Sequence, residues 1–427
     1  MKEAFILAWR TLVRGRFLPI LLLGAAAVTM FMPGLIRTDG TAAGARQLYI
    51  HSVLGCVAAL VCISILCASC GHLAQSREKH RLSLAVIRPV GAFRAMVGIW
   101  LAYVAAAALA LFAMAAVVYF RAPGGDVPCR HHVAPMMPST MSVAISSIDE
   151  FLAKPTTPAG LRKAPRSSVL AYLAATEMDR YEPINPGASA KWDFPAQLAE
   201  ASDLRLRVRF SMLFAARADL AGEFTLGTAH AVISNSTQAV VEVPLLRKEA
   251  GGDGKSANGA NGVVSAEFKN TGKETVMLRP RQDLFILSPA DSFGANMFRA
   301  MVYVLAGVAL AAAFGLFLSA GLSRPVAVFT AFVSIVVIFI APSVIDQYPD
   351  GAGLPLGDRI GLMLSRGVYA VTSSLSDASP IADLAEDRCV EWAPLVRAVL
   401  VNAMLVPLAL LGFAAMAIRR KTLPDHV

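Results

Sequence analysis

A thiol, two imidazoles and two thioethers lie within nine residues of this sequence. Cys129, His131 and His132 are followed by Met136 and Met137. Soft sulfur ligands combined with imidazole favour copper over harder cations. Because the spacing matches no defined metal site, two interpretations stay open: a copper-binding loop, or an ordinary loop that contains these residue types.

Two patterns associated with catalysis are incomplete. The stretch 251–256 ends like a phosphate-binding loop, but Glu249 stands where the motif needs its first glycine, and no buried strand precedes it. No serine–histidine–acid or cysteine–histidine arrangement stands out either. We therefore expect a non-enzymatic chain without a cofactor of its own, and we interpret 251–256 as a hairpin loop.

The composition indicates an integral membrane protein. Of 427 residues, 56% are hydrophobic and only 16% are charged, whereas soluble proteins have about 25% charged residues. The net charge of +9 could suggest nucleic-acid binding, but the basic residues flank apolar runs, as topology and anionic headgroups require. We expect membrane lipid, and not nucleic acid, as a partner.

Six apolar runs each have the length of about 20 residues that a helix needs to cross a bilayer. None contains Asp or Glu, so energy for any transport would come from another polypeptide. Basic segments between the runs place both termini in the cytoplasm.

Residues 1–16 precede the first run as an amphipathic helix, and the outer segment 346–393 contains a helix near Leu356–Leu375. The runs are Phe17–Ile36, His51–Gly71, Met96–Phe120, Met297–Ala320, Val326–Ile345 and Leu395–Ile418. Pro342 and Pro407 are interpreted as kinks, and Arg299 and Arg397 are expected to snorkel to the headgroups.

A basic loop, 72–94, joins the second and third runs on the cytoplasmic side. Its apolar centre, Leu82–Ile87, is too short to cross a membrane and predicts a short amphipathic helix at the surface. The loop either only determines the topology, or it is the segment through which a soluble partner moves the adjacent helices.

The segment 121–296 has the composition and size of a soluble domain outside the membrane. Two short helices are predicted at Ile145–Leu152 and Ser167–Asp179. Alternating apolar and polar residues then predict short antiparallel strands of a β-sandwich or jelly roll. The strands are Leu204–Phe210, Gly222–Leu226, Ala229–Ile233, Ala239–Pro244, Gly262–Phe268, Thr275–Leu278 and Leu284–Ser288. The predicted organisation is therefore 1–120 with three membrane helices, 121–296 as an external mainly-β domain, and 297–427 with three more helices.

The six cysteines fall into two groups. Four lie in the second apolar run and should behave as buried hydrophobic residues: Cys56, Cys62, Cys67 and Cys70. Cys129 and Cys389 lie in segments predicted to be external, where they could form a disulfide in an oxidising compartment. Their separation along the chain does not show their distance in space, so this pairing stays open.

The membrane portion resembles the permease subunits of type-2 ABC exporters, closest to the group associated with multicopper-enzyme maturation. The resemblance depends on Glu78, the apolar run 82–87 and Pro89-Val90, although His80-Arg81 replaces the family's Gly-Thr pair. Asp291-Ser-Phe293, Asn296, Arg299 and the turn Ser323-Arg-Pro-Val326 are similar to members that have a large external β-domain.

The resemblance implies a permease of the bacterial inner membrane that exports its substrate by alternating access at a dimer interface. Its partners would be two cytoplasmic ATPase subunits, which bind ATP and magnesium, a second permease copy or sister subunit, and a periplasmic protein. The loop 74–90 would be the coupling helix that docks on the ATPase. The coupling residues would be Arg77, Glu78, Lys79, Arg81, Leu82, Leu84, Pro89 and Val90.

Two alternatives remain. One keeps the ATPase but makes the complex a lipid-extracting machine or a mechanical transmitter. The other is a membrane-anchored receptor or scaffold whose external β-domain binds a ligand.

Overall fold

Two compact units make up the computed structural model of the chain. One comprises Met1–Val127 and Ser292–Val427, and the other comprises Pro128–Asp291; we call them the helical unit and the β unit. The structure describes residues 1–35, 42–78, 91–122, 128–136, 152, 182–195, 198, 204–209, 211–212, 220–226, 229–236, 240–247, 263–279, 283–347, 357, 359–363, 365–367, 369 and 379–422.

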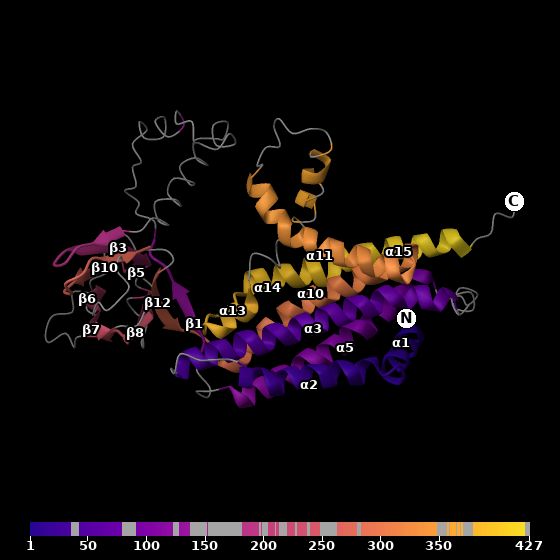
Figure 1. Ribbon diagram of the computed structural model, residues 1–427, viewed down its shortest axis with the longest axis horizontal. Helices are drawn as coiled ribbons and strands as arrows, with labels where there is room; N and C mark the ends of the chain where they lie inside the picture. The colour runs from indigo at the N-terminus through magenta and orange to yellow at the C-terminus, as the bar shows by residue number, and fades with distance from the viewer. Residues whose placement is uncertain are drawn as a thin grey trace. The chain divides into compact units, whose positions relative to one another are not determined.

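Long helices that run side by side form the helical unit (Figure 1). Its first part consists of α1 (Lys2–Arg14), α2 (Phe17–Leu35), α3 (Ala42–Glu78) and α5 (Ala92–Arg121). After the β unit, α10 (Phe293–Gly321) and α11 (Arg324–Gln347) follow. The last part is α13 (Pro380–Ala385), α14 (Trp392–Ala398), the π-helix η2 (Val399–Leu405) and α15 (Val406–Thr422).

Five stretches of the described helices are long and apolar enough to cross a membrane. They are Phe17–Leu35, Gly44–Leu73, Ala92–Arg121, Phe293–Gly321 and Trp392–Ile418. The predicted helical, multi-pass membrane protein with a separate β unit is confirmed in this outline. The fifth predicted run coincides with α11, whose described apolar part, Arg324–Ile338, is shorter. The sixth crossing and the sidedness of the bundle therefore stay predictions.

The second apolar run was predicted to begin at His51, but its helix, α3, already begins at Ala42. Hydropathy failed here because this part of α3 contains Arg46, which looks like a loop residue. The Arg46 side chain is in fact buried, with 3% of the residue exposed. Its guanidinium pairs with Asp387 and lies 4.5 Å from the centre of the Phe293 ring.

A π-helix, η2, directly precedes Pro407, where the sequence predicts a kink. Proline has no N–H to donate to the carbonyl four residues earlier, and its ring crowds that carbonyl. In η2 the helix widens just before the proline, and the Val406 N–H bonds to the Val401 carbonyl, five residues back. Asn402 lies in this wider turn and is fully buried.

Small residues form much of the core of the helical unit. Ala102, Ala106 and Ala110 of α5 are fully buried, as are Ala312 and Ala313 of α10. Helices in lipid associate through close packing because the surrounding lipid is as apolar as their side chains. These alanines let α3, α5, α10 and α15 approach one another closely.

Three antiparallel sheets form the β unit, in the strand orders β1-β12-β4-β8, β3-β10-β6-β7-β9 and β2-β11-β5. All seven predicted strands occur: β4 (Arg205–Arg209), β6 (Leu220–Leu226), β7 (Ala229–Ser236), β8 (Val240–Pro244), β10 (Val263–Asn270), β11 (Val276–Leu278) and β12 (Leu284–Pro289). Five further strands were not predicted: β1 (Arg130–Val133), β2 (Glu182–Ile184), β3 (Ser189–Pro195), β5 (Ser211–Met212) and β9 (Leu246–Arg247).

One hydrophobic core contains residues from all three sheets. It contains Leu206 of β4, Phe194 of β3, Phe224 of β6 and Leu278 of β11. In β4 the alternation is as predicted: Leu206 and Val208 are fully buried, while Arg207 pairs with Glu242 of β8 at 3.6 Å.

Two groups of predicted helices are less fully described. Ile145–Leu152 and Ser167–Asp179 lie outside the described residues, apart from residue 152. In the outer segment, the described residues between 357 and 369 are helical, in agreement with the prediction of a helix there.

Candidate functional site: the base of the coupling segment

The candidate site is the place where the predicted coupling segment, residues 74–90, joins the helical bundle. Arg77 and Glu78 belong to the last turn of α3, and α5 begins at Ala92. The remaining predicted coupling residues lie outside the described residues: Lys79, Arg81, Leu82, Leu84, Pro89 and Val90. The structure therefore shows the two helices that hold the segment.

A buried tyrosine joins these two helices just before the segment. The Tyr103 hydroxyl of α5 donates a hydrogen bond to the Ala68 carbonyl of α3 at 3.2 Å, and it lies 3.0 Å from His72 Nδ1. Because the hydroxyl proton goes to Ala68, the imidazole tautomer protonated at Nδ1 completes the network by donating to the phenol oxygen. The end of α3 and the start of α5 are thus held together by polar as well as apolar contacts.

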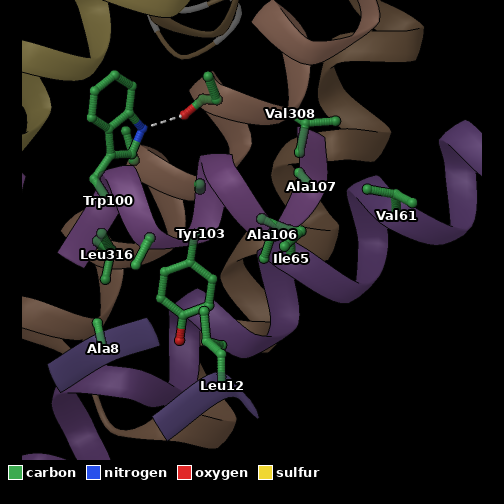
Figure 2. Close-up of a cluster of buried hydrophobic side chains, with 14 of the residues drawn as sticks. Ala8, Leu12, Val61, Ile65, Trp100, Tyr103, Ala106, Ala107, Val308 and Leu316 are labelled. Carbon is green, nitrogen blue, oxygen red and sulfur yellow. Dashed lines mark hydrogen bonds between the residues drawn. The ribbon is translucent and has the colours of Figure 1, made fainter. Parts of the chain in front are cut away.

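Helix α1 packs against α5 next to this tyrosine. Figure 2 shows Ala8 and Leu12 of α1 beside Tyr103, and both α1 residues are buried. The contact is close at Gly98, where an added Cβ would lie 2.6 Å from the Met1 carbonyl oxygen and 3.1 Å from the Ala4 Cβ. Glycine at this position lets the two helix backbones meet.

Helix α10 links both helices to the second half of the bundle. The indole Nε1 of Trp100 in α5 donates to the Ala309 carbonyl of α10 at 2.9 Å (Figure 2). On α3, Ser69 packs directly on Gly315 of α10, where any Cβ would overlap the serine oxygen. Ser69 donates to Leu66 and Ser319 donates to Leu316, each at 2.9 Å, so both buried hydroxyls are satisfied within their own helix.

The turn that precedes α11 lies at the same end of the bundle. The Cys70 thiol donates to the Ala327 carbonyl at 3.8 Å, and Gly71 lies against the Arg324 guanidinium. The predicted basic turn 323–325 is therefore close to the end of α3 that continues into the coupling segment. Together with the basic α1, this gives the bundle one strongly cationic end.

At the other end, buried polar side chains fix the segment that leads into α14. Asn296 of α10 is fully buried; its amide donates to the Arg388 carbonyl at 2.8 Å and its oxygen accepts from the Val390 N–H at 2.8 Å. Arg299 donates to the Val390 carbonyl at 3.3 Å and lies 5.3 Å from the Trp392 ring centre. We call this arrangement the return clamp.

The return clamp corrects one prediction. Arg299 does not snorkel to headgroups, because the residue is only 5% exposed and its guanidinium bonds to the protein backbone. Arg397 is exposed, as a snorkelling residue must be. Near the clamp, burial raises the pKa of the Asp383 carboxyl above its ordinary value, more than the neighbouring Arg388 lowers it.

A cleft of about 360 Å³ lies beside the clamp, between the start of α3 and α13. Gln47, His51 and Glu386 are its polar lining residues, and Gly44, Leu48, Ala382 and Ala385 complete the wall.

The predicted metal-binding stretch is only partly described. His131 and His132 are neighbours in β1, so their side chains project from opposite faces of the strand. Met136 lies beyond β1 in an isolated bridge with Asp193, and Met137 is outside the described residues. Among the described residues no group of three or more His, Cys, Asp or Glu could hold a metal ion. The copper hypothesis stays untested.

The cysteines again form two groups. Cys56, Cys62, Cys67 and Cys70 are free thiols in α3; Cys70 is buried as predicted, whereas the other three are only partly buried. Neither Cys129 nor Cys389 is a free thiol. The pairing of these two residues stays a prediction, which peptide mapping under non-reducing conditions would test.

The sequence predicts a coupling segment but does not indicate the residues that hold its base. Tyr103 lies inside an apolar run and His72 at the edge of a basic loop, and neither pattern indicates that the two side chains meet. Comparisons with protein-family models, with curated proteins and with solved structures found no match to this chain.

Proposed function

We propose that this protein is the permease subunit of an ATP-driven exporter. Separate cytoplasmic ATPase subunits bind the coupling segment and drive the transport cycle. The observation that supports the proposal best is the construction of the segment's base. One end of the segment continues α3 without a break, the other enters α5 at Ala92, and Tyr103 joins the two helices. A force on the segment would therefore move α3 and α5 together.

The packing indicates which other helix such a movement would displace. Both helices contact α10, α3 through Ser69 and Gly315 and α5 through the Trp100–Ala309 hydrogen bond. Because packed helices shift as rigid elements, tilting α3 and α5 would displace α10 as well. In a dimer with a second copy or sister subunit, this displacement would open and close a path at the interface between the subunits.

The cationic end of the bundle supports the proposed orientation. Lys and Arg are concentrated in cytoplasmic segments of membrane proteins. Arg10, Arg14, Arg94 and Arg324 all belong to the end that carries the coupling segment. We therefore place this end, with both termini, in the cytoplasm of a bacterial cell and the β unit outside the inner membrane, where it could meet a periplasmic partner.

The proposal predicts that reversing a charge at the end of α3 uncouples the complex. In Glu78→Lys or Arg77→Glu, we expect substrate-stimulated ATPase activity to fall at least about tenfold, since a charge pair that becomes a like-charge contact loses 1.4 kcal/mol or more. The measurement is ATP hydrolysis by the purified complex in lipid, with and without its substrate.

A matched control is Glu3→Lys, which makes the same charge change on an exposed residue of α1. Membrane insertion and yield should be unchanged in all three variants. Normal stimulation in both coupling variants would remove the support for this function.

A further inference from the structure

Helix α1 presents three different faces along its length. Ala8 and Leu12 lie on the face that is buried against α5. At 100° per residue, Trp9, Val13 and Ile6 follow one another on an adjacent face, and Val13 and Ile6 are 42% and 37% exposed. Arg10 and Arg14 come next around the helix and are exposed. An apolar face flanked by cations is the pattern of a helix that lies in the headgroup region of a membrane.

The cations of α1 have no protein partner in the part of the chain that the structure describes. Lys2, Arg10 and Arg14 are exposed, as is Arg16 just beyond the helix, and the ion pairs found among the described residues are made by other side chains. A helix built only for docking on α5 would need just its buried face. The exposed apolar face and the exposed cations of α1 are therefore available to another occupant.

The neighbouring helix indicates what that occupant is. Only Gly15 and Arg16 separate α1 from α2, and α2 is an apolar span with Leu23 and Phe31 more than 70% exposed. Apolar side chains exposed on a membrane-spanning helix face lipid, so α1 lies where the lipid headgroups of the same leaflet are. We propose that α1 is a binding site for anionic phospholipid, with Arg10 and Arg14 on the headgroup phosphates and Ile6, Trp9 and Val13 among the upper acyl carbons.

This site reaches the base of the coupling segment through direct contacts. The opposite face of α1 packs on α5 at Gly98, beside Tyr103. Anionic lipid bound to α1 holds the helix against the bilayer and so favours the packed position of α5. The proposal does not depend on the ATPase, because it concerns only the contact between α1 and lipid.

The test uses Trp9 as an internal reporter in the full-length protein, reconstituted into vesicles. Brominated phosphatidylglycerol or brominated phosphatidylcholine is added at equal mole fraction in a phosphatidylcholine background. The chain has four tryptophans, so the Trp9 signal is taken as the difference between the wild-type protein and Trp9→Phe. We expect stronger quenching of this signal by the brominated anionic lipid.

The double variant Arg10→Gln/Arg14→Gln should lower the preference for the anionic lipid about tenfold, because each basic residue near an anionic surface contributes about 1 kcal/mol before screening. The control Lys269→Gln/Lys273→Gln removes two exposed cations from the β unit and should leave the preference unchanged. Equal quenching of wild-type Trp9 by the two lipids would overturn the proposal, and so would the absence of any Trp9-dependent quenching. Both of these results come from the wild-type protein and do not depend on how the arginine variants fold.

Discussion

Replacing Gly315 with leucine is expected to prevent α10 from packing against α3 and to leave little folded protein. A Cβ at this position would overlap the Ser69 oxygen and would lie 3.0 Å from the Leu66 carbonyl oxygen, which belongs to the backbone and cannot rotate away. Because α3 and α10 form the central contact of the bundle, we expect a loss of about 3 kcal/mol or more. This loss of stability is measured by the midpoint of thermal unfolding of the full-length protein in detergent.

Gly55→Leu is the matched control, since Gly55 lies in α3 and an added Cβ would have no neighbour within 4 Å. This variant should unfold near the wild-type temperature. The double variant Ser69→Gly/Gly315→Ala should recover part of the stability that Gly315→Ala alone loses, because it removes the overlapping oxygen. Equal midpoints for Gly315→Leu and Gly55→Leu would show that the helices do not cross at this point.

Replacing Asn296 with alanine is expected to release the segment held by the return clamp. The change removes two hydrogen bonds and leaves the Arg388 carbonyl and the Val390 N–H without their side-chain partner. Buried polar groups that lose a partner cost about 1–3 kcal/mol each, so for the two groups we expect a loss of about 2–6 kcal/mol. Hydrogen exchange of peptides covering 383–392 in the full-length protein should become faster.

The control for this prediction is Ser292→Ala, at the start of the same helix. The Ser292 hydroxyl is exposed and caps α10 by accepting from the Ala295 N–H at 3.3 Å. Its loss should cost about 1 kcal/mol or less and should not affect exchange in 383–392. Unchanged exchange in Asn296→Ala would contradict the clamp.

Residue patterns in the sequence predicted the helices and strands of the fold better than they predicted the contacts between them. The alternation of Leu206 and Val208 with arginines predicted β4 because a strand with one buried face must alternate. Apolar runs without Asp or Glu predicted the five helices of membrane-spanning length, because acidic side chains are costly inside a bilayer. Strands β1, β2, β5 and β9 were missed, since each is only two to four residues long and carries too little pattern. Strand β3 was missed although its seven residues include buried Ala190, Trp192 and Phe194 at alternate positions.

Positions that depend on a distant partner could not be predicted. The charge of Arg46 is typical of a loop residue, and its place in a buried part of a helix is explained only by its contacts with Asp387 and Phe293. In the same way, the role of Tyr103 in joining α3 and α5 depends on its contacts with Ala68 and His72. The basic loop, in contrast, was recognisable because its charges and its short apolar centre are local features.

Crosslinking in living cells tests most directly whether a nucleotide hydrolase binds the coupling segment, as we propose. A photo-activatable amino acid is placed at Leu84, in the apolar centre of the segment, and the crosslinked partners are identified by mass spectrometry. The control position is Phe120, which is 83% exposed at the opposite end of α5. The account predicts an ATPase subunit crosslinked from Leu84 and not from Phe120. Crosslinks from Leu84 that contain no nucleotide hydrolase would contradict it.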